Sequence, residues 1–163
     1  MTDAAPEIFV ALEQSSFAAA VRQSLWLYPA ANVGHIVALT FFAGAVAVID
    51  VRLLGGLAAT SPAFLLARAR SFAVAALAGM AVTGCVLFSA EASHIVLNPA
   101  FQLKAALVAA GLINVAIYEL WAKRTVERLV PGASMPARAK VAGVLSLGIW
   151  VAVAACGRGI AYF

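Results

Sequence analysis

Residues 33–54 read VGHIVALTFFAGAVAVIDVRLL, an apolar run that holds one histidine, His35, and no charged residue before Asp50. Apolar residues make up 64% of the whole chain, charged residues only 11%, and the mean hydropathy is +1.00. A soluble domain has about a quarter of its residues charged, and this composition folded in water would expose large apolar surfaces. The sequence therefore predicts an integral membrane protein.

A bilayer core about 30 Å thick needs about 20 mostly apolar residues per helix, and lipid does not tolerate unpaired backbone groups. Four segments meet this requirement, and four segments cannot close a β-barrel. The sequence thus predicts an all-α integral membrane protein, a four-transmembrane-helix bundle that forms a single membrane domain over residues 1–163. The expected spans are residues 29–50, 71–91, 99–121 and 141–158.

Residues 1–24 do not qualify as a span, because Glu13 and Arg22 interrupt their apolar side chains. Their pattern predicts a short interfacial helix on the outer surface of the membrane, capped by Asp3 and with Pro6 in its opening turn. The alternative is a frayed tail. The first residues are acidic where a signal peptide needs a basic start, so no cleavable signal peptide is predicted.

Lysine and arginine residues gather in two of the three connections between the predicted spans. One basic connection follows the first span and the other follows the third, whereas residues 91–100 hold no Lys or Arg. By the positive-inside rule, the basic connections face the cytoplasm and both termini face outward. We expect a multi-pass protein of the bacterial inner membrane with both termini on the periplasmic side. The basic residues behind the pI of 9.5 are then explained by this orientation and do not indicate a nucleic-acid partner. The basic residues concerned are Arg52, Arg68, Arg70, Lys123, Arg124, Arg128, Arg138 and Lys140.

Five residues with metal-binding or charged side chains share the outer halves of the predicted helices. Ionisable residues inside a span are costly and usually face a bundle interior or a functional cavity. We therefore predict a cofactor site in the outer half of the bundle. The residues are His35, Cys85, His94, Lys104 and Cys156.

His35 is the first candidate ligand, about 9 Å below the start of its span at Pro29. It is predicted to be an axial ligand of a b-type haem or a ligand of copper. The alternative is a neutral imidazole that holds two helices together. His94 is the candidate second ligand, although it lies about 10 Å closer to the outer surface. Its alternative is a solvated interfacial histidine.

Lys104 is predicted to pair with a cofactor carboxylate, such as a haem propionate, or with Glu91. Alternatively, its side chain extends to the outer headgroups. If Cys85, Cys156 and Met80 converge on His35, the softer ligand set favours copper over haem. Otherwise the two cysteines are small packing residues.

Charged residues at the inner end are expected to have structural roles. Asp50 and Arg52 are predicted to form an ion pair at the membrane boundary or to meet headgroups. Glu119 and Lys123 have the i,i+4 spacing of a helical ion pair. The chain contains no Ser-His-Asp spacing, phosphate-binding glycine loop, HExxH or CxxC motif, which excludes the corresponding enzyme classes.

Two stretches resemble a bacterial membrane family known as a domain of unknown function. They are HIVALTFFAGAVAVIDVRLLG at residues 35–55, with His35, Gly44, Arg52 and Leu53, and NPAFQLKAALVAAGLIN at residues 98–114. More distantly, the chain is similar to the membrane domain of copper resistance D proteins and to membrane protoporphyrinogen oxidases. In the latter, a first-helix histidine and a later lysine are functionally important. The resemblance implies that His35 and Lys104 correspond to these two functionally important residues. The chain lacks the methionine- and histidine-rich segments of copper-handling proteins.

These observations lead to one expected function and two alternatives. The expected function is a membrane redox protein that holds one b-type haem near the outer face and exchanges electrons with quinol or a periplasmic partner. The first alternative is a copper-binding or copper-transporting membrane protein. The second is a non-catalytic membrane subunit, without a cofactor, in a homo- or hetero-oligomer. Whether the protein is an enzyme stays open.

Overall fold

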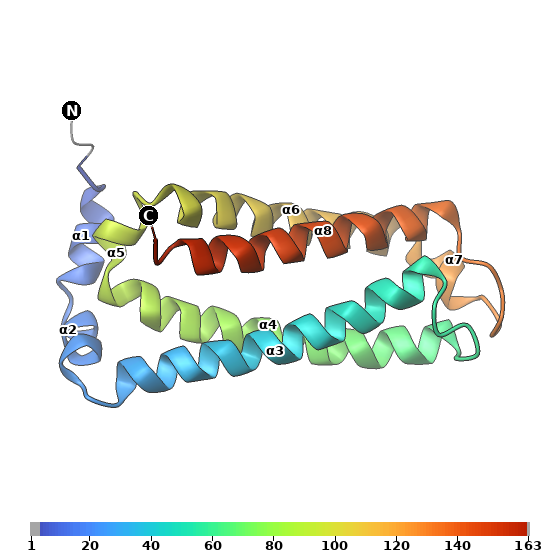
Figure 1. Ribbon diagram of the computed structural model, residues 1–163, viewed down its shortest axis with the longest axis horizontal. Coiled ribbons are helices and arrows are strands. Elements are labelled where there is room, and N and C mark those ends of the chain that lie inside the picture. The colour runs from blue at the N-terminus through green and yellow to red at the C-terminus, as the bar shows by residue number, and fades with distance from the viewer. Residues whose placement is uncertain (1–3, 163) are drawn as a thin grey trace.

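The computed structural model describes residues 4–162, in which helices are the only regular elements. Short helices lie at the N-terminus and in the connections, and long helices form the body of the molecule (Figure 1). In chain order the helices are α1 (Glu7–Glu13), α2 (Ser16–Gln23), α3 (Leu27–Leu54), α4 (Pro62–Ala90), α5 (Ala92–Ile95), α6 (Pro99–Trp121), α7 (Lys123–Glu127) and α8 (Ala137–Gly159).

Four of these helices, α3, α4, α6 and α8, are long and apolar enough to cross a membrane. The predicted four-helix membrane bundle is therefore confirmed. Helix α4 begins at Pro62 and not near residue 71, so Arg68 and Arg70 lie inside the helix and not in a connection. The helix accommodates both charges near its first turns, because Arg68 packs over the Phe64 ring and Arg70 pairs with Glu119.

Local sequence signals fix where the long helices begin and end. Helix α3 stops at Gly55, whose φ of 106° is a left-handed conformation that favours glycine. Helix α6 starts at Asn98-Pro99, where the Asn98 side chain accepts hydrogen bonds from the backbone N–H groups of Ala100 and Phe101. Both signals are readable in the sequence.

The long helices form two antiparallel hairpins, α3–α4 and α6–α8, stacked in two layers (Figure 1). The hairpins meet mainly through α3 and α8, whereas α4 and α6 meet through separate side-chain pairs, Arg70 with Glu119 and Phe88 with Phe101. Helices α1, α2 and α5 and the C-terminal residues lie at one end of the bundle, which we call the terminal end. Helix α7 and the connection between α3 and α4 lie at the other, which we call the loop end.

The buried apolar core lies in the half of the bundle next to the loop end. In the half next to the terminal end, over residues 27–41, 74–88, 99–110 and 149–159, Val153 is the single buried residue. Side chains that face the interior there stay half-buried. The hairpins thus close tightly around the loop half and less tightly around the terminal half. The core cluster is Leu53, Leu66, Tyr118, Ala122, Val126, Met135, Ala139 and Ala142.

The predicted short N-terminal helix is present but is divided into α1 and α2 at Ser15, whose hydroxyl caps α2 by accepting from Ala18 N–H at 3.2 Å. The two helices lie across the terminal end (Figure 1). Arg22 Nη1 fixes them by donating to the carbonyls of Glu13 and Ala90, both at 2.9 Å. Helix α1 begins after Pro6, and the predicted Asp3 cap lies outside the described residues.

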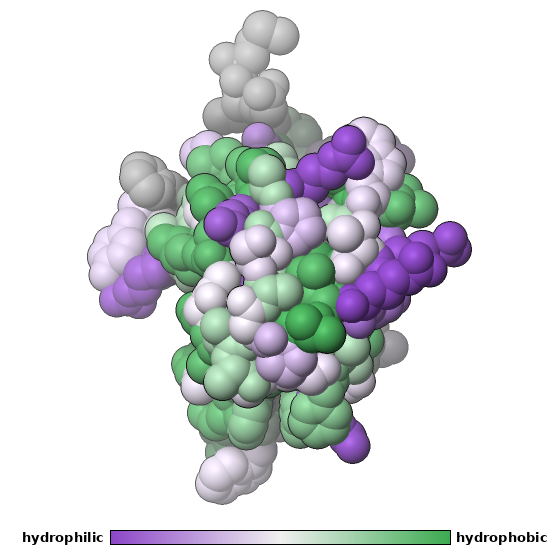
Figure 2. Space-filling view, turned by 90° about the vertical axis from the view of Figure 1, so that its right-hand side faces the viewer, coloured by the Kyte–Doolittle hydropathy of each residue, from purple (hydrophilic) through white to green (hydrophobic). Residues whose placement is uncertain are grey.

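Figure 2 looks onto the loop end and shows several hydrophilic side chains projecting from it, while apolar surface covers much of the flanks. Apolar flanks are expected where side chains face lipid, and a polar end is expected where the chain leaves it. The helices and connections at this end carry most of the basic residues: Arg68, Arg70, Lys123, Arg124, Arg128, Arg138 and Lys140.

Candidate functional site

His35 lies in the terminal half of α3 and contacts α4 through its Nδ1 atom. Thr83 Oγ1 is 2.9 Å from His35 Nδ1 and 2.7 Å from the Gly79 carbonyl oxygen. A carbonyl oxygen only accepts, so the single hydroxyl hydrogen of Thr83 points to Gly79. The hydrogen between Thr83 and His35 must then sit on Nδ1. The imidazole is neutral in this arrangement, and its Nε2 atom carries the free lone pair.

Glycines let α3 and α4 approach closely at this contact. A Cβ added to Gly84 would lie 3.4 Å from His35 Cε1, and one added to Gly34 would lie 3.3 Å from Thr83 Cγ2. Small residues of this kind allow close backbone packing between helices in lipid. The His35 ring is therefore held between two closely packed helices, with its orientation fixed by Thr83.

On the second hairpin, Lys104 of α6 and Cys156 of α8 lie in the terminal half, as His35 does. A Cβ added to Gly157 would lie 3.5 Å from Lys104 Nζ, so the ammonium group lies against α8 beside Cys156. No ion pair of Lys104 with Glu91 occurs in residues 4–162. The four long helices thus contribute one polar residue each: His35, Thr83, Lys104 and Cys156.

The other predicted ligands do not join this group. His94 lies on α5 at the terminal end and is exposed, about 10 Å beyond the level of Thr83 along α4. Cys85 is exposed on the surface of α4, and Met80 is half-buried on the same helix. Within residues 4–162, no group of three or more His, Cys, Asp or Glu side chains could hold a metal ion.

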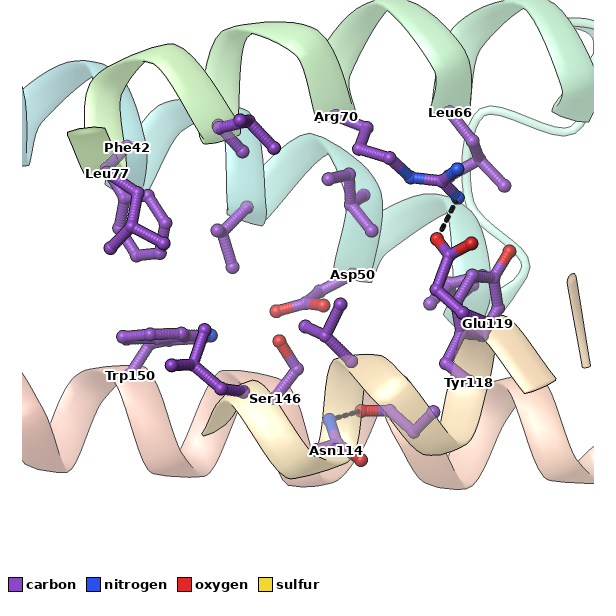
Figure 3. A pocket seen from close by; sticks show the side chains of 18 residues that line it. Phe42, Asp50, Leu66, Arg70, Leu77, Asn114, Tyr118, Glu119, Ser146 and Trp150 are labelled. Carbon is purple, nitrogen blue, oxygen red and sulfur yellow. Dashed lines mark hydrogen bonds and ion pairs between the residues drawn. The ribbon is translucent and has the colours of Figure 1, made fainter. Parts of the chain in front are cut away.

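A second polar site, which the sequence did not predict, lies in the loop half. All four long helices line a cavity of about 180 Å³ there (Figure 3). Its walls are mainly apolar, and its polar side chains are Asp50, Arg70, Asn114, Tyr118, Glu119 and Ser146.

The predicted ion pair between Asp50 and Arg52 is wrong, because Arg52 bonds backbone carbonyl groups and the Asp50 carboxylate lies apart from it. Arg52 is fully buried and donates to the carbonyls of Gly56 and Thr60 at 3.4 and 3.3 Å. Asp50 is 1% exposed, and neither of its carboxylate oxygens has a hydrogen-bond partner among residues 4–162. One signal was readable, since Phe42, Val46, Asp50 and Leu53 follow a helical spacing that places Asp50 on the interior face.

The other polar residues around the cavity are paired. Glu119 bonds Lys123 at 2.7 Å, which confirms the predicted i,i+4 pair, and it also pairs with Arg70 at 2.8 Å. Asn114 Nδ2 donates to the Ala142 carbonyl at 3.0 Å and joins α6 to α8. Tyr118 and Ser146 are the exceptions: the buried Tyr118 hydroxyl has no partner among residues 4–162, and the Ser146 hydroxyl lies beside the Asp50 carboxyl group. Asp50 and Tyr118 therefore carry the unmatched polar atoms of this site.

The fold and the two sites define a four-helix membrane protein with one polar group in each half of its interior. The chain belongs to DUF6644, a family of unknown function, whose family model matches residues 15–163. No curated protein and no solved structure matches the chain significantly. The predicted resemblance to an uncharacterised membrane family is thereby confirmed, whereas these comparisons show no link to copper resistance D proteins or to protoporphyrinogen oxidase.

Proposed function

We propose that this protein is a membrane redox protein that holds one b-type haem in the terminal half, with His35 Nε2 as the axial ligand. The observation that carries this proposal is the contact of His35 Nδ1 with Thr83 at 2.9 Å. Histidines that ligate metals usually donate their other ring N–H to a fixed acceptor, which sets the tautomer and the ring orientation. Here Thr83 would have that role, and Nε2 is the nitrogen left to ligate.

The surroundings of His35 fit a haem in two further respects. Interior-facing side chains of the terminal half, His35 among them, are only half-buried, so the His35 ring stays accessible to a ligand. Lys104 offers a positive charge within the same half, which would pair with a haem propionate. The haem, when bound, would supply one-electron chemistry, while His35, Thr83 and Lys104 would bind and orient it.

The position of His94 favours ligation by a single histidine. Two axial ligands must approach one iron at the same level, and His94 lies about 10 Å further toward the terminal end. A bis-histidine site would therefore need α5 to move into the bundle. The copper alternative is less well supported, because it required Cys85 to converge on His35 and Cys85 is exposed.

The charge distribution supports an orientation for the proposed site. Basic residues gather at the loop end, so the positive-inside rule favours a cytoplasmic loop end and an outward-facing terminal end. In a bacterial inner membrane, both termini and the His35 site would then lie toward the periplasm. Electrons would be exchanged with a periplasmic partner or with quinol.

The absorption spectrum of the detergent-purified protein, oxidised and then reduced with dithionite, tests this proposal. Expression with ample haem is expected to give a Soret band and reduced α and β bands at one haem per chain. The alternative in which His35 only holds α3 and α4 together predicts no such bands. Absence of the bands under these conditions would overturn the proposal, and stoichiometric copper in the same sample would favour copper binding.

Two substitutions separate the ligand role of His35 from its structural role. In His35→Asn, the amide N–H₂ replaces Nδ1 as a donor toward Thr83, but Nε2 is lost. We expect a folded protein without a Soret band. Thr83→Val keeps Nε2 and removes the orienting bond, so haem affinity is expected to fall about 10–100-fold. Thr40→Val is the matched control, because the Thr40 hydroxyl bonds only the Ile36 carbonyl of its own helix.

A further inference from the structure

The cavity around Asp50 in the loop half is a second site that the His35 proposal does not use. We propose that it binds the ring of a lipid-soluble quinol or quinone, with the Asp50 carboxyl group as the hydrogen-bond partner of the ring's oxygen substituent. Binding itself is independent of the haem. Only the further step, in which this ring exchanges electrons with the His35 site, rests on the proposed function.

Asp50 is a buried carboxyl group without a hydrogen-bond partner among residues 4–162. Its side chain is 1% exposed. The Ser146 hydroxyl faces this carboxyl group across the cavity (Figure 3). A charged carboxylate without a partner is strongly unfavourable at such a position. Asp50 must therefore be protonated or accept a hydrogen bond from a bound molecule, and either form suits an oxygen-bearing ring.

The size and walls of the cavity fit a single substituted ring. Its volume is about 180 Å³, and an apolar cavity of roughly 150 Å³ in another protein admits benzene. The Phe42 and Trp150 rings, 4.6 Å apart between centroids, form one wall together with Leu77. A mainly apolar pocket with a few polar groups is typical of a small-molecule site. Tyr118 supplies a second unpartnered group, a hydroxyl that can donate or accept.

The cavity is bordered by surface that faces lipid. The backbones of α4 and α6 make few close contacts, and the cavity lies between them and α3 and α8. The Arg70–Glu119 ion pair and the stacked Phe88 and Phe101 rings join the two helices on either side of the level of Val74 and Val115. Val74 on α4 and Leu112 and Val115 on α6 line it, although these side chains are 61%, 48% and 44% exposed. A ligand dissolved in the bilayer can therefore reach Asp50 between α4 and α6 without crossing water.

A metal or alkali cation fits the same cavity less well. Hard cations require about six oxygen ligands, several of them usually carboxylates or carbonyls. Asp50 has the Ser146 hydroxyl beside it, but no group of three acidic, His or Cys side chains gathers anywhere in residues 4–162. An organic molecule that needs one or two hydrogen bonds and an apolar wall suits the site better.

Trp150 allows binding to be measured directly, because it lines the cavity and quinones quench tryptophan fluorescence. The other tryptophans, Trp26 and Trp121, are exposed near the two ends and can be replaced by Phe. In this single-tryptophan protein, in lipid nanodiscs without added haem, we titrate decylubiquinone. The expected result is saturable quenching of Trp150. Quenching that stays linear up to the solubility limit would overturn the proposal.

Asp50→Leu tests the polar contact. An unpaired buried carboxyl replaced by an apolar group of similar size usually costs little stability. We expect the variant to stay folded and to bind decylubiquinone at least about tenfold more weakly. A change of this size corresponds to the loss of one hydrogen bond to a charged or acidic group. Wild-type affinity in this variant would overturn the role of Asp50.

Val115→Phe tests access from the lipid, and Ile117→Phe is its matched control. Both residues lie on α6 and are 44% exposed, but only Val115 lines the cavity. Val115→Phe is expected to weaken or abolish quenching, and Ile117→Phe is expected to leave it unchanged. Equal effects of the two variants would overturn the proposed opening.

Two further outcomes would replace the proposal. If sodium or potassium changes Trp150 fluorescence in the wild type but not in Asp50→Leu, the site binds a cation. If Val115→Phe dissociates a dimer in nanodiscs, a second copy covers this face. Quenching is measured without haem, so failure here leaves the His35 proposal intact, and a missing Soret band leaves this one intact.

Discussion

The two halves of the bundle differ in how deeply they bury their polar side chains. In the loop half, Arg52, Asp50, Asn114 and Tyr118 are buried among tightly packed apolar residues. In the terminal half, His35 and Lys104 are only half-buried, and Val153 is the single buried residue of the ranges that form it. The loop half therefore carries most of the stability. The terminal half joins its helices through polar and aromatic contacts, His35 with Thr83 and Phe88 with Phe101, and leaves its polar side chains more accessible.

Arg52→Ala should produce the largest loss of stability in this comparison. The change leaves a cavity in the loop half and removes the donors to the Gly56 and Thr60 carbonyls. We expect the free energy of unfolding to fall by about 3–5 kcal/mol, measured by chemical denaturation in detergent with far-UV circular dichroism. Arg68→Ala is the control, since Arg68 is exposed and its loss should cost no more than about 0.5 kcal/mol. Similar losses in both variants would show that the loop half is not the stable half.

Gly111→Ala should have the next largest effect, at the boundary between the halves. A Cβ at Gly111 would lie 2.9 Å from Trp150 Cζ2, and the Trp150 ring is itself packed edge-on against Phe42. Overpacking of this kind typically costs about 1–3 kcal/mol. Gly148→Ala on α8 is the control, because nothing lies within 4 Å of the added Cβ. That variant should gain up to about 1 kcal/mol from helix propensity. Thermal unfolding of both variants in the same detergent tests whether the melting temperature falls in Gly111→Ala and rises in Gly148→Ala.

Thr83→Val measures how much the polar contact of the terminal half stabilises the protein. Hydrogen bonds between membrane helices contribute about 0.6 kcal/mol on average, so the free energy of unfolding without haem should fall by about that amount. Thr40→Val should change it by less. A loss as large as that of Arg52→Ala would mean that the His35–Thr83 contact is mainly structural, and it would weaken the proposed ligand role.

Acidification should have the smallest effect, confined to α1. Ser93 donates to the Glu13 carboxylate from its hydroxyl and its N–H, at 2.5 and 2.8 Å, and these bonds lower the pKa of Glu13 below its ordinary value of 4.5. The Glu13–Ser93 contact therefore stabilises α1 fully above pH 4.5, and this stabilisation is lost as the pH falls through the lowered pKa of Glu13. The protection of α1 amides from hydrogen exchange, relative to their intrinsic rate at each pH, should fall in that window. Glu13→Gln should show low protection at neutral pH and no further loss of protection on acidification.

The sequence predicted the fold well because its strongest signals are local. Apolar length fixed the four spans, and Asn98-Pro99 marked a helix start that the structure retains. The start of α4 was predicted too late, because Arg68 and Arg70 were assigned to a connection. Their charges are compatible with a helix, since Arg70 meets Glu119 from α6. That partner is 49 residues away in the sequence and cannot be inferred from local pattern.

The sites were harder to predict, because they depend on how deep each residue lies in the membrane and on which face of its helix the side chain projects from. The shared level of His35 and Lys104 followed from helix rise, and the structure places both in the terminal half. The convergence of Cys85 could not be judged, since a small residue in an apolar run carries little information on which face it occupies. Asp50 was assigned to the membrane boundary because it precedes Arg52 by two residues. Two residues on a helix are about 200° apart, so the pair points in opposite directions.

The pairing of the helices has a consequence for biogenesis. Each hairpin is formed by long helices that follow one another among the spans, and α3 packs most extensively against α4. We expect the first hairpin to assemble in the membrane while the ribosome is still translating the second. Helices α1 and α2 precede both hairpins in the chain, and they contact α3, α4 and α5. They must therefore wait for α5, which is made before the second hairpin, so their docking can complete the terminal end while α6 and α8 are still being made.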